Sequence, residues 1–171
     1  MGDDGMRSRD GQPLELVLYA YPQRPDLVTF QPVVRAALAE LGIAVTTRVT
    51  ETPGDQASSG DYDLFLWAVH TAPAGDPGFF LSLFFETDAE RNYSGWSNAE
   101  YDALMDDLRA EGDPQARIDL ALKAQELIAA EAPVSFLMTP EWHVGLSPAL
   151  ADYTPWGSDY YVIRPDLTVA E

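Results

Sequence analysis

The stretch Leu14–Thr50, LELVLYAYPQRPDLVTFQPVVRAALAELGIAVTTRVT, decides the fold of this 171-residue chain. Its first part, Leu14–Ala20, alternates between apolar and polar residues as a strand does, and Ile43–Thr50 is rich in the β-branched residues that favour a second strand. Between these two strands, apolar residues recur with the spacing of a helix. A strand–helix–strand unit joins parallel strands through a right-handed crossover in nearly all cases.

The helix between these strands is predicted from its caps and its periodicity. Thr29 serves as the N-cap, Pro32 lies in the first turn, where its missing N–H is harmless, and Gly42 ends the helix. Apolar residues recur at i, i+3, i+4 and i+7, which predicts one buried face. That face consists of Phe30, Val33, Val34, Ala37, Leu38 and Leu41.

More elements follow this unit. Thr52–Gly60 is polar and turn-rich, whereas Tyr62–Val69 is nearly continuously apolar and is predicted to be a strand buried on both faces. Phe79–Phe85 is a short, very apolar element. Two short strands, Val134–Thr139 and Trp142–Leu146, are predicted near the end of the chain.

Two helices are predicted between Phe85 and Val134. Ser97 and Glu100 form a capping box before the first, and Asp113–Pro114 caps and starts the second, which runs to about Glu131. The second helix is predicted to bury Ile118, Ala121, Leu122, Gln125 and Ile128. These elements together indicate an α/β fold, a mostly parallel sheet flanked by helices.

Composition excludes several classes of partner. The formal net charge is −18, from 28 acidic and 10 basic residues, and such a surface repels nucleic-acid phosphates and anionic lipids. Apolar residues make up 46% of the chain, enough to form a core. Because the chain has no cysteine, it has no disulfides and no sulfur ligands for zinc.

The sequence contains no constellation of catalytic residues. Phosphate-binding loops, dinucleotide fingerprints and nucleophile elbows are absent, and the two histidines, His70 and His143, belong to no H-E-x-x-H motif. Carboxylate pairs such as Glu86 and Asp88 are expected by chance among so many acidic residues. We therefore predict a protein that is not an enzyme and has no catalytic residue, metal site or cofactor.

Residues for ligand binding are predicted where strands end. In open α/β sheets, ligand contacts gather at the carboxyl ends of the strands. Trp67 offers a large flat surface suited either to a core or to a ligand wall, and His70 is either a ligand contact or a hydrogen-bonded structural histidine. The candidate ligand-binding residues are Trp67, His70, Asp76, Tyr21 and Arg24.

The segment Asn92–Pro133, NYSGWSNAEYDALMDDLRAEGDPQARIDLALKAQELIAAEAP, combines an aromatic-Ser-Asn turn, an E-Y-D opening, a D-P helix start and a closing E-x-A-P. Four further segments precede it, namely Gly2–Leu14, Leu16–Pro22, Ala36–Val45 and Tyr62–Phe85. In this order the segments together resemble the family 5 extracellular solute-binding proteins of bacterial ABC importers, and Asn92–Pro133 is the best match. The resemblance therefore extends over nearly the whole chain.

The resemblance implies a type II periplasmic-binding-protein-like fold, in which two α/β lobes close over a ligand. Family members are much longer, so the chain is expected to be a C-terminal part and an excised fragment. Residues 1–149 would form a partial second lobe, and residues 150–171 would be the segment that crosses back to the first lobe. The missing N-terminal lobe is then a partner, and apolar surface left uncovered predicts a homodimer of the fragment.

The function that the resemblance implies is solute binding for an ABC importer of oligopeptides, dipeptides or metal chelates. Its partners would be a small solute or peptide and the permease subunits, and its location would be extracytoplasmic, in the periplasm or lipid-anchored outside the cell membrane. Trp67 corresponds to a tryptophan of the ligand wall. The chain departs from the family in two places: Val69–Ala74 has no aspartate for a peptide amino group, and Glu86–Tyr93 has no histidine for nickel.

Two other functions remain open. A lobe of this kind can be reused as a sensory or protein-interaction module. Fold alone also does not exclude a small-molecule enzyme.

Overall fold

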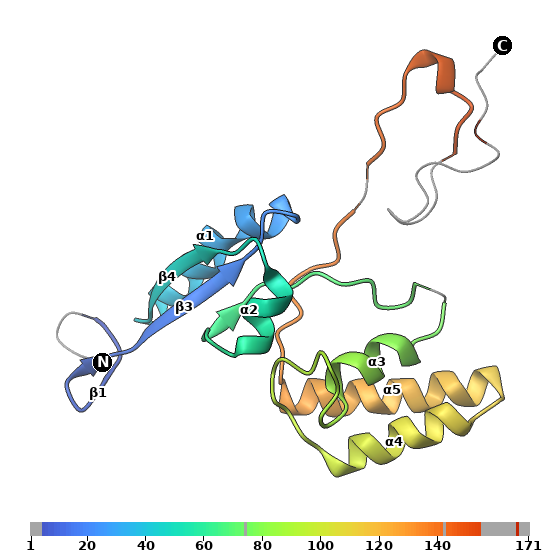
Figure 1. Ribbon diagram of the computed structural model, residues 1–171, viewed down its shortest axis with the longest axis horizontal. Coiled ribbons are helices and arrows are strands. Elements are labelled where there is room, and N and C mark those ends of the chain that lie inside the picture. The colour runs from blue at the N-terminus through green and yellow to red at the C-terminus, as the bar shows by residue number, and fades with distance from the viewer. Residues whose placement is uncertain (1–4, 74, 142, 155–166, 168–171) are drawn as a thin grey trace. The chain divides into compact units, whose positions relative to one another are not determined.

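The computed structural model describes residues 5–73, 75–141, 143–154 and 167 (Figure 1). The chain divides into two units, Met1–Val134 and Ser135–Glu171. The first unit contains a parallel sheet and the α-helices. In the described part of the second unit, the regular element is a short 3₁₀ helix, η1 (Pro148–Leu150). None of the described helices combines the length and hydropathy of a membrane-spanning segment.

The central sheet has β3 (Glu15–Ala20) in the middle, between β4 (Ala44–Val49) and β5 (Leu64–Phe65). Both neighbours run parallel to β3. The predicted α/β fold with a mostly parallel sheet is therefore confirmed. A separate antiparallel ribbon is formed by β1 (Ser8–Arg9) and β2 (Gln12–Pro13).

The third strand is much shorter than the predicted Tyr62–Val69. Leu66 N–H still donates to the Tyr19 carbonyl at 2.9 Å, but Ala68 N–H donates instead to the hydroxyl of Tyr21, at 3.2 Å. Beyond Leu66, the side chain of Tyr21, which directly follows β3, therefore takes the place of a strand-to-strand backbone hydrogen bond. The predicted turn-rich stretch before β5 also differs, because it contains α2 (Pro53–Ser59).

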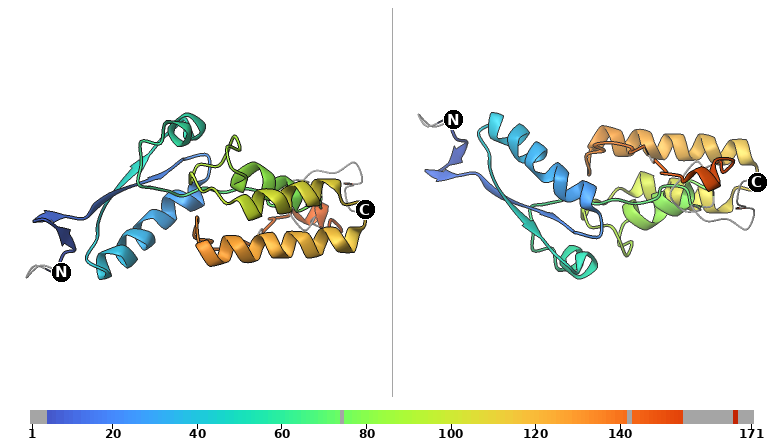
Figure 2. Two further views of the ribbon diagram at one scale, coloured as in Figure 1. Left: turned by 90° about the horizontal axis from the view of Figure 1, so that it is seen from below. Right: turned by 90° about the horizontal axis from the view of Figure 1, so that it is seen from above.

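Helices α1 (Pro25–Glu40) and α2 lie on opposite faces of the sheet (Figure 2). The predicted start of α1 at Thr29 is wrong. Pro25 occupies the first turn, where its fixed φ suits a helix, so α1 begins earlier and Pro32 lies in its interior. The Thr29 hydroxyl donates within the helix to the Pro25 carbonyl, at 3.0 Å.

The buried face of α1 agrees in part with the prediction, since Phe30 and Val34 pack against the core beneath this helix. Leu27 and Gln31 are buried against the sheet, whereas Val33 and Leu41 are 55% and 50% exposed, contrary to the predicted face. Gln31 is the buried polar residue of this contact, and it is satisfied by the sheet. Its Nε2 donates to the carbonyl of Leu18 in β3 at 3.0 Å and to that of Arg48 in β4 at 2.7 Å.

Replacing Gln31 with methionine is expected to lower the free energy of unfolding by about 1–3 kcal/mol, because one buried and one partly buried carbonyl lose a donor while the volume stays similar. Urea denaturation followed by circular dichroism measures this loss. The matched control is Gln23→Met, since Gln23 is exposed and makes one bond to the Glu51 carbonyl. The control should change stability by less than about 0.5 kcal/mol. Equal losses in the two variants would contradict the buried-donor argument.

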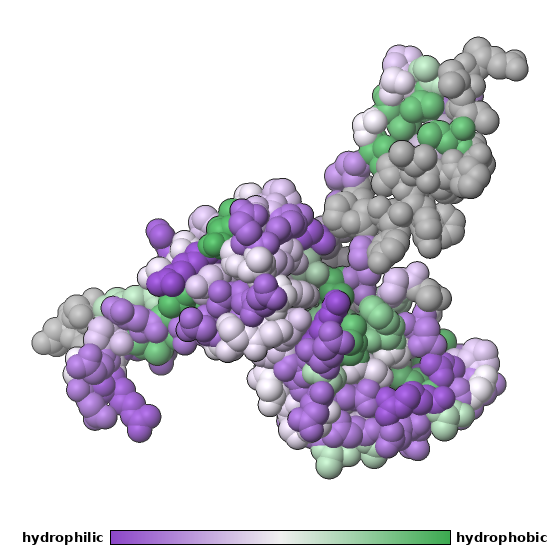
Figure 3. Space-filling model, in the orientation of Figure 1, coloured by the Kyte–Doolittle hydropathy of each residue, from purple (hydrophilic) through white to green (hydrophobic). Residues whose placement is uncertain are grey.

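The second half of this unit is helical. Helices α3 (Gly78–Phe85), α4 (Ala99–Ala110) and α5 (Pro114–Glu131) pack together (Figure 1). On the face shown in Figure 3, the surface over α4 is mainly hydrophilic, and hydrophobic side chains gather around α3. The buried core consists of Leu81, Phe84, Phe85, Tyr101, Met105, Leu108, Ala121, Ala124 and Ile128.

The caps and buried face of these helices differ in part from the predictions. Asp113 caps α5 as predicted, but Asn98 rather than Ser97 caps α4, since the Asn98 side chain accepts from the backbone of Glu100 and Tyr101. In α5, Ile118 and Leu122 are 47% and 53% exposed, contrary to prediction. Ala121 and Ile128 are buried as predicted, and the small residue Ala124 also faces the core.

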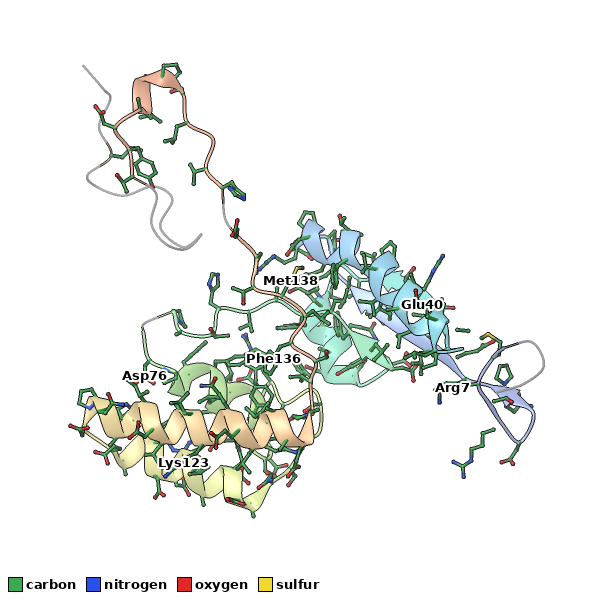
Figure 4. The ribbon with its side chains drawn as sticks, turned by 180° about the vertical axis from the view of Figure 1, so that it is seen from behind. Arg7, Glu40, Asp76, Lys123, Phe136 and Met138 are labelled. Atoms are coloured by element: carbon green, nitrogen blue, oxygen red, sulfur yellow. The ribbon has the colours of Figure 1, made fainter. Side chains whose placement is uncertain are left out.

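The two strands predicted after α5 are wrong for the residues that the structure describes. Residues 134–139 and 143–146 belong to no strand, while Trp142 lies outside the described residues. A strand requires the ladder hydrogen bonds of a neighbour, and no ladder of the described chain includes this segment. Phe136 and Met138 are 67% and 50% exposed along it (Figure 4).

Candidate functional site

Two aromatic residues meet at the carboxyl edge of the sheet. Tyr21 directly follows β3, and Trp67 comes two residues after β5. Because β3 and β5 are parallel, their ends lie at the same edge, and the two rings pack with centroids 5.4 Å apart. The structure therefore brings together two of the five residues predicted from the sequence.

Tyr21 holds the chain that leaves β5. Its ring is buried, and its hydroxyl accepts from Ala68 N–H at 3.2 Å and donates to the Ala68 carbonyl at 3.5 Å. Burial raises the pKa of Tyr21, so the phenol stays neutral. Tyr21 thus fixes the backbone immediately after Trp67.

Trp67 is half-buried and lies among three other aromatic rings. Besides Tyr21, it packs against Phe65 with centroids 5.4 Å apart and against Tyr93 with centroids 5.2 Å apart. It also contacts both the core beneath α1 and the core of the helical half. We call Tyr21, Trp67 and Tyr93 the aromatic wall.

Tyr93 was not predicted as a site residue. It lies in the turn between α3 and α4, and its carbonyl accepts from the Tyr62 hydroxyl at 2.9 Å. Asn92 holds this turn, because its Nδ2 donates to the carbonyls of Glu86 and Trp96 at 3.0 and 2.6 Å. One local feature of the sequence could have indicated Tyr93: it directly follows Asn92, a residue type that often stabilises a turn.

The charged candidates are engaged within the chain. Asp76 accepts from Gly78 N–H and from Arg117, both at 2.7 Å. Arg24 forms a two-bond pair with Asp26 at 3.1 and 3.2 Å, and this hydrogen bonding lowers the pKa of Asp26. The structure therefore attaches Asp76 to the helical half and Arg24 to the first turn of α1.

The remaining candidate, His70, is half-buried and comes three residues after Trp67 in the chain. A hollow of about 300 Å³ lies elsewhere, along β3 and the segment before β5. Among the described residues, no group of three or more acidic or histidine side chains could hold a metal ion. The hollow is lined by Val17, Tyr19, Arg48, Gly60, Asp61, Tyr62 and Asp63.

Comparison with known proteins finds solute-binding proteins, although no protein-family model matches the chain. The nickel-binding protein NikA of Staphylococcus aureus is 22% identical over 158 residues, 92% of this chain and 32% of NikA. Di/tripeptide-binding protein 4 of Pseudomonas aeruginosa is 31% identical over 120 residues, 66% of this chain and 22% of the relative.

Solved structures with a similar fold also include proteins of solute transport. The nickel ABC transporter structure from Bacillus halodurans superposes with a TM-score of 0.69 and 27% identity, covering 75% of this chain and 27% of that one. The chain thus spans about a third or less of the length of these relatives.

Proposed function

We propose that this chain, a homologue of the family 5 extracellular solute-binding proteins, is a ligand-binding lobe in the binding component of an ABC importer. The relatives are binding proteins, and the fold is that of their type II periplasmic-binding-protein lobe. In this role the chain binds and releases a solute and changes no covalent bond.

The aromatic wall carries this proposal. It lies at the carboxyl ends of β3 and β5, the edge where open α/β sheets bind ligands. The half-buried indole of Trp67 keeps part of its surface open while Tyr21 and Tyr93 support the rest. A flat surface held on several sides needs little reordering when a solute packs on it.

The proposed solute is a peptide or a metal chelate, since relatives are named as di/tripeptide-binding and nickel-binding proteins. We propose that Trp67 and Tyr93 contact it, with His70 and Arg24 as polar neighbours. Tyr21 and Asp76 would act mainly by holding the backbone around the wall, because their polar atoms bond within the chain.

The opposite side of the binding crevice is proposed to come from polypeptide outside these 171 residues, because the relatives are about three times longer or more. Residues 150–171 would cross to that part, but most of them lie outside the described residues. We further propose an extracytoplasmic location and contact with permease subunits. Self-association of the isolated chain stays a prediction, and exposed Phe136 and Met138 favour it.

A nuclear magnetic resonance titration of the ¹⁵N-labelled 171-residue chain tests this function. The probes are trialanine and the nickel–L-histidine complex, with glucose as the negative control. We expect one of the two probes to shift the Trp67 indole N–H and the amides of His70 and Thr71, with weak affinity because one side of the crevice is absent. Zinc–L-histidine, a diamagnetic analogue, checks any nickel effect for paramagnetic broadening.

The assignment of the Trp67 resonance comes from Trp67→Phe. If the shifted resonances lay instead around the hollow lined by Arg48 and Asp61, the aromatic wall would not be the binding surface. If neither probe changed any resonance at millimolar concentration, peptide and chelate binding by this lobe would be excluded.

A further inference from the structure

One guanidinium links the end of the candidate ligand loop to the helical half of the chain. Arg117 in α5 donates from Nη2 to Asp76 Oδ2 at 2.7 Å, across 41 positions of sequence. The other carboxylate oxygen, Asp76 Oδ1, accepts from Gly78 N–H at the start of α3, also at 2.7 Å. Figure 4 shows Asp76 beside the N-terminal part of α5.

The same arginine also closes the end of α4. Its Nη1 donates to the carbonyls of Leu108 and Glu111, the latter at 3.0 Å. Carbonyl groups at a helix C-terminus have no partner within the helix, so they need donors from elsewhere. The planar fork of arginine supplies donors in several directions at once, which the single ammonium of lysine does not. Arg117 thus joins the turn before α3, the end of α4 and the start of α5.

Gly78 is the residue that lets this arrangement close. A Cβ atom at position 78 would lie 2.8 Å from Asp76 Oδ1 and 3.6 Å from Arg117 Nη2. The first distance is shorter than Cβ contacts normally are. A larger residue would therefore push the Asp76 carboxylate away from the Gly78 amide. We call Asp76, Gly78 and Arg117 the loop clasp.

The loop clasp is suited to ordering a loop more than to stabilising the fold. The Arg117 and Asp76 side chains are 24% and 46% exposed, so solvent screens their ion pair. The loop His70–Asp76 has its N-terminal end held through Ala68 by Tyr21 and its C-terminal end held by Arg117. A loop held at both ends loses less conformational freedom when a solute binds.

We propose that Arg117 is a positioning residue for solute binding: through the loop clasp it fixes the C-terminal end of the loop His70–Asp76, which begins three residues after Trp67. This inference rests on the proposed function. Arg117 itself contacts no solute in this arrangement. Its loss should therefore weaken binding through the loop and leave the cores unchanged.

Hydrogen exchange of the full 171-residue chain tests the loop clasp without any ligand. In Arg117→Gln and Gly78→Ala, the hydrogen-bonded amides of Gly75 and of residue 78 should exchange at least tenfold faster than in the wild type. The buried amides of α4 and α5 should keep their rates. Arg117→Lys should not restore slow exchange, because it keeps the charge and loses the fork. The control is Lys123→Gln, an exposed change on the same helix (Figure 4), which should alter none of these rates.

Binding by the same variants tests the positioning role. Titrated with trialanine or nickel–L-histidine, whichever the wild type binds, Arg117→Gln should show a dissociation constant raised five- to tenfold, and Lys123→Gln should match the wild type. Faster exchange throughout α3, α4 and α5 would show that Arg117 stabilises the whole helical half, and the positioning role would be wrong. Unchanged affinity with a faster-exchanging loop would overturn the positioning role.

The two proposals fail in different ways. If the wild type bound neither probe while exchange changed only at the loop, the proposed function and the positioning role would be wrong. The loop clasp would still hold as a structural link. If binding were normal and exchange at Gly75–Gly78 did not respond to Arg117, the loop clasp alone would be wrong.

Discussion

Replacing Tyr101 with alanine is expected to lower the free energy of unfolding by about 3–5 kcal/mol, the cost of removing a large buried aromatic side chain. Tyr101 is fully buried at the centre of the helical core. Its ring packs against Trp96 with centroids 5.0 Å apart and against Phe85 with centroids 6.4 Å apart. Alanine would leave a cavity that α3, α4 and α5 all border.

The variant Tyr101→Phe separates the ring from the hydroxyl. The hydroxyl donates to the Leu81 carbonyl at 2.9 Å, and burial strongly raises the pKa of Tyr101, so it stays a neutral donor. Removing this one bond should cost about 0.5–1.5 kcal/mol. Urea denaturation followed by circular dichroism measures both variants. Similar losses for alanine and phenylalanine would mean that the hydroxyl, not the ring, stabilises this core.

Replacing Trp67 with alanine is expected to weaken binding of the effective probe, trialanine or nickel–L-histidine, at least about tenfold, because buried aromatic anchors dominate such contacts. The indole is the member of the aromatic wall that touches both Tyr21 and Tyr93. Its removal also leaves those two rings without their common neighbour. The amide shifts of His70 and Thr71 measure binding in this variant.

Two controls separate binding from stability for Trp67. Trp67→Phe keeps a flat ring and should lose less affinity than Trp67→Ala. Tyr101→Phe lowers stability without changing a residue of the aromatic wall and should bind the probe as the wild type does. If Trp67→Ala bound with unchanged affinity, the wall would be part of the core only, and the proposed site would be wrong.

Local signals in the sequence predicted the central unit of the fold well. Strands β3 and β4 follow from alternation and β-branching, and Asp113–Pro114 gives the start of α5. These signals depend on residues that are close together in the sequence, so they can be recognised without knowledge of the tertiary structure. Where two signals competed, as Thr29 and Pro25 did for the start of α1, the position that fixes φ in the first turn decided the outcome.

Predictions of buried faces were less successful for a physical reason. Periodicity shows that one stripe of a helix is apolar, but not which part of a wide stripe meets the neighbouring element. In α5, the close approach to α4 selects Ala121 and Ala124 and leaves Ile118 and Leu122 exposed. In α1, one of the two buried residues is the polar Gln31, which only the two strand carbonyls beneath it explain.

The sequence by itself determined the α/β class, the order of the main elements and the edge where Tyr21 and Trp67 lie, because strand direction places both after parallel strands. Only the tertiary structure added Tyr93 to the aromatic wall and paired Asp76 with Arg117, 41 residues away. Partners this distant leave no periodic trace in the chain. Their contact arises only when the packing of α3, α4 and α5 brings a turn, a helix end and a helix start to one point.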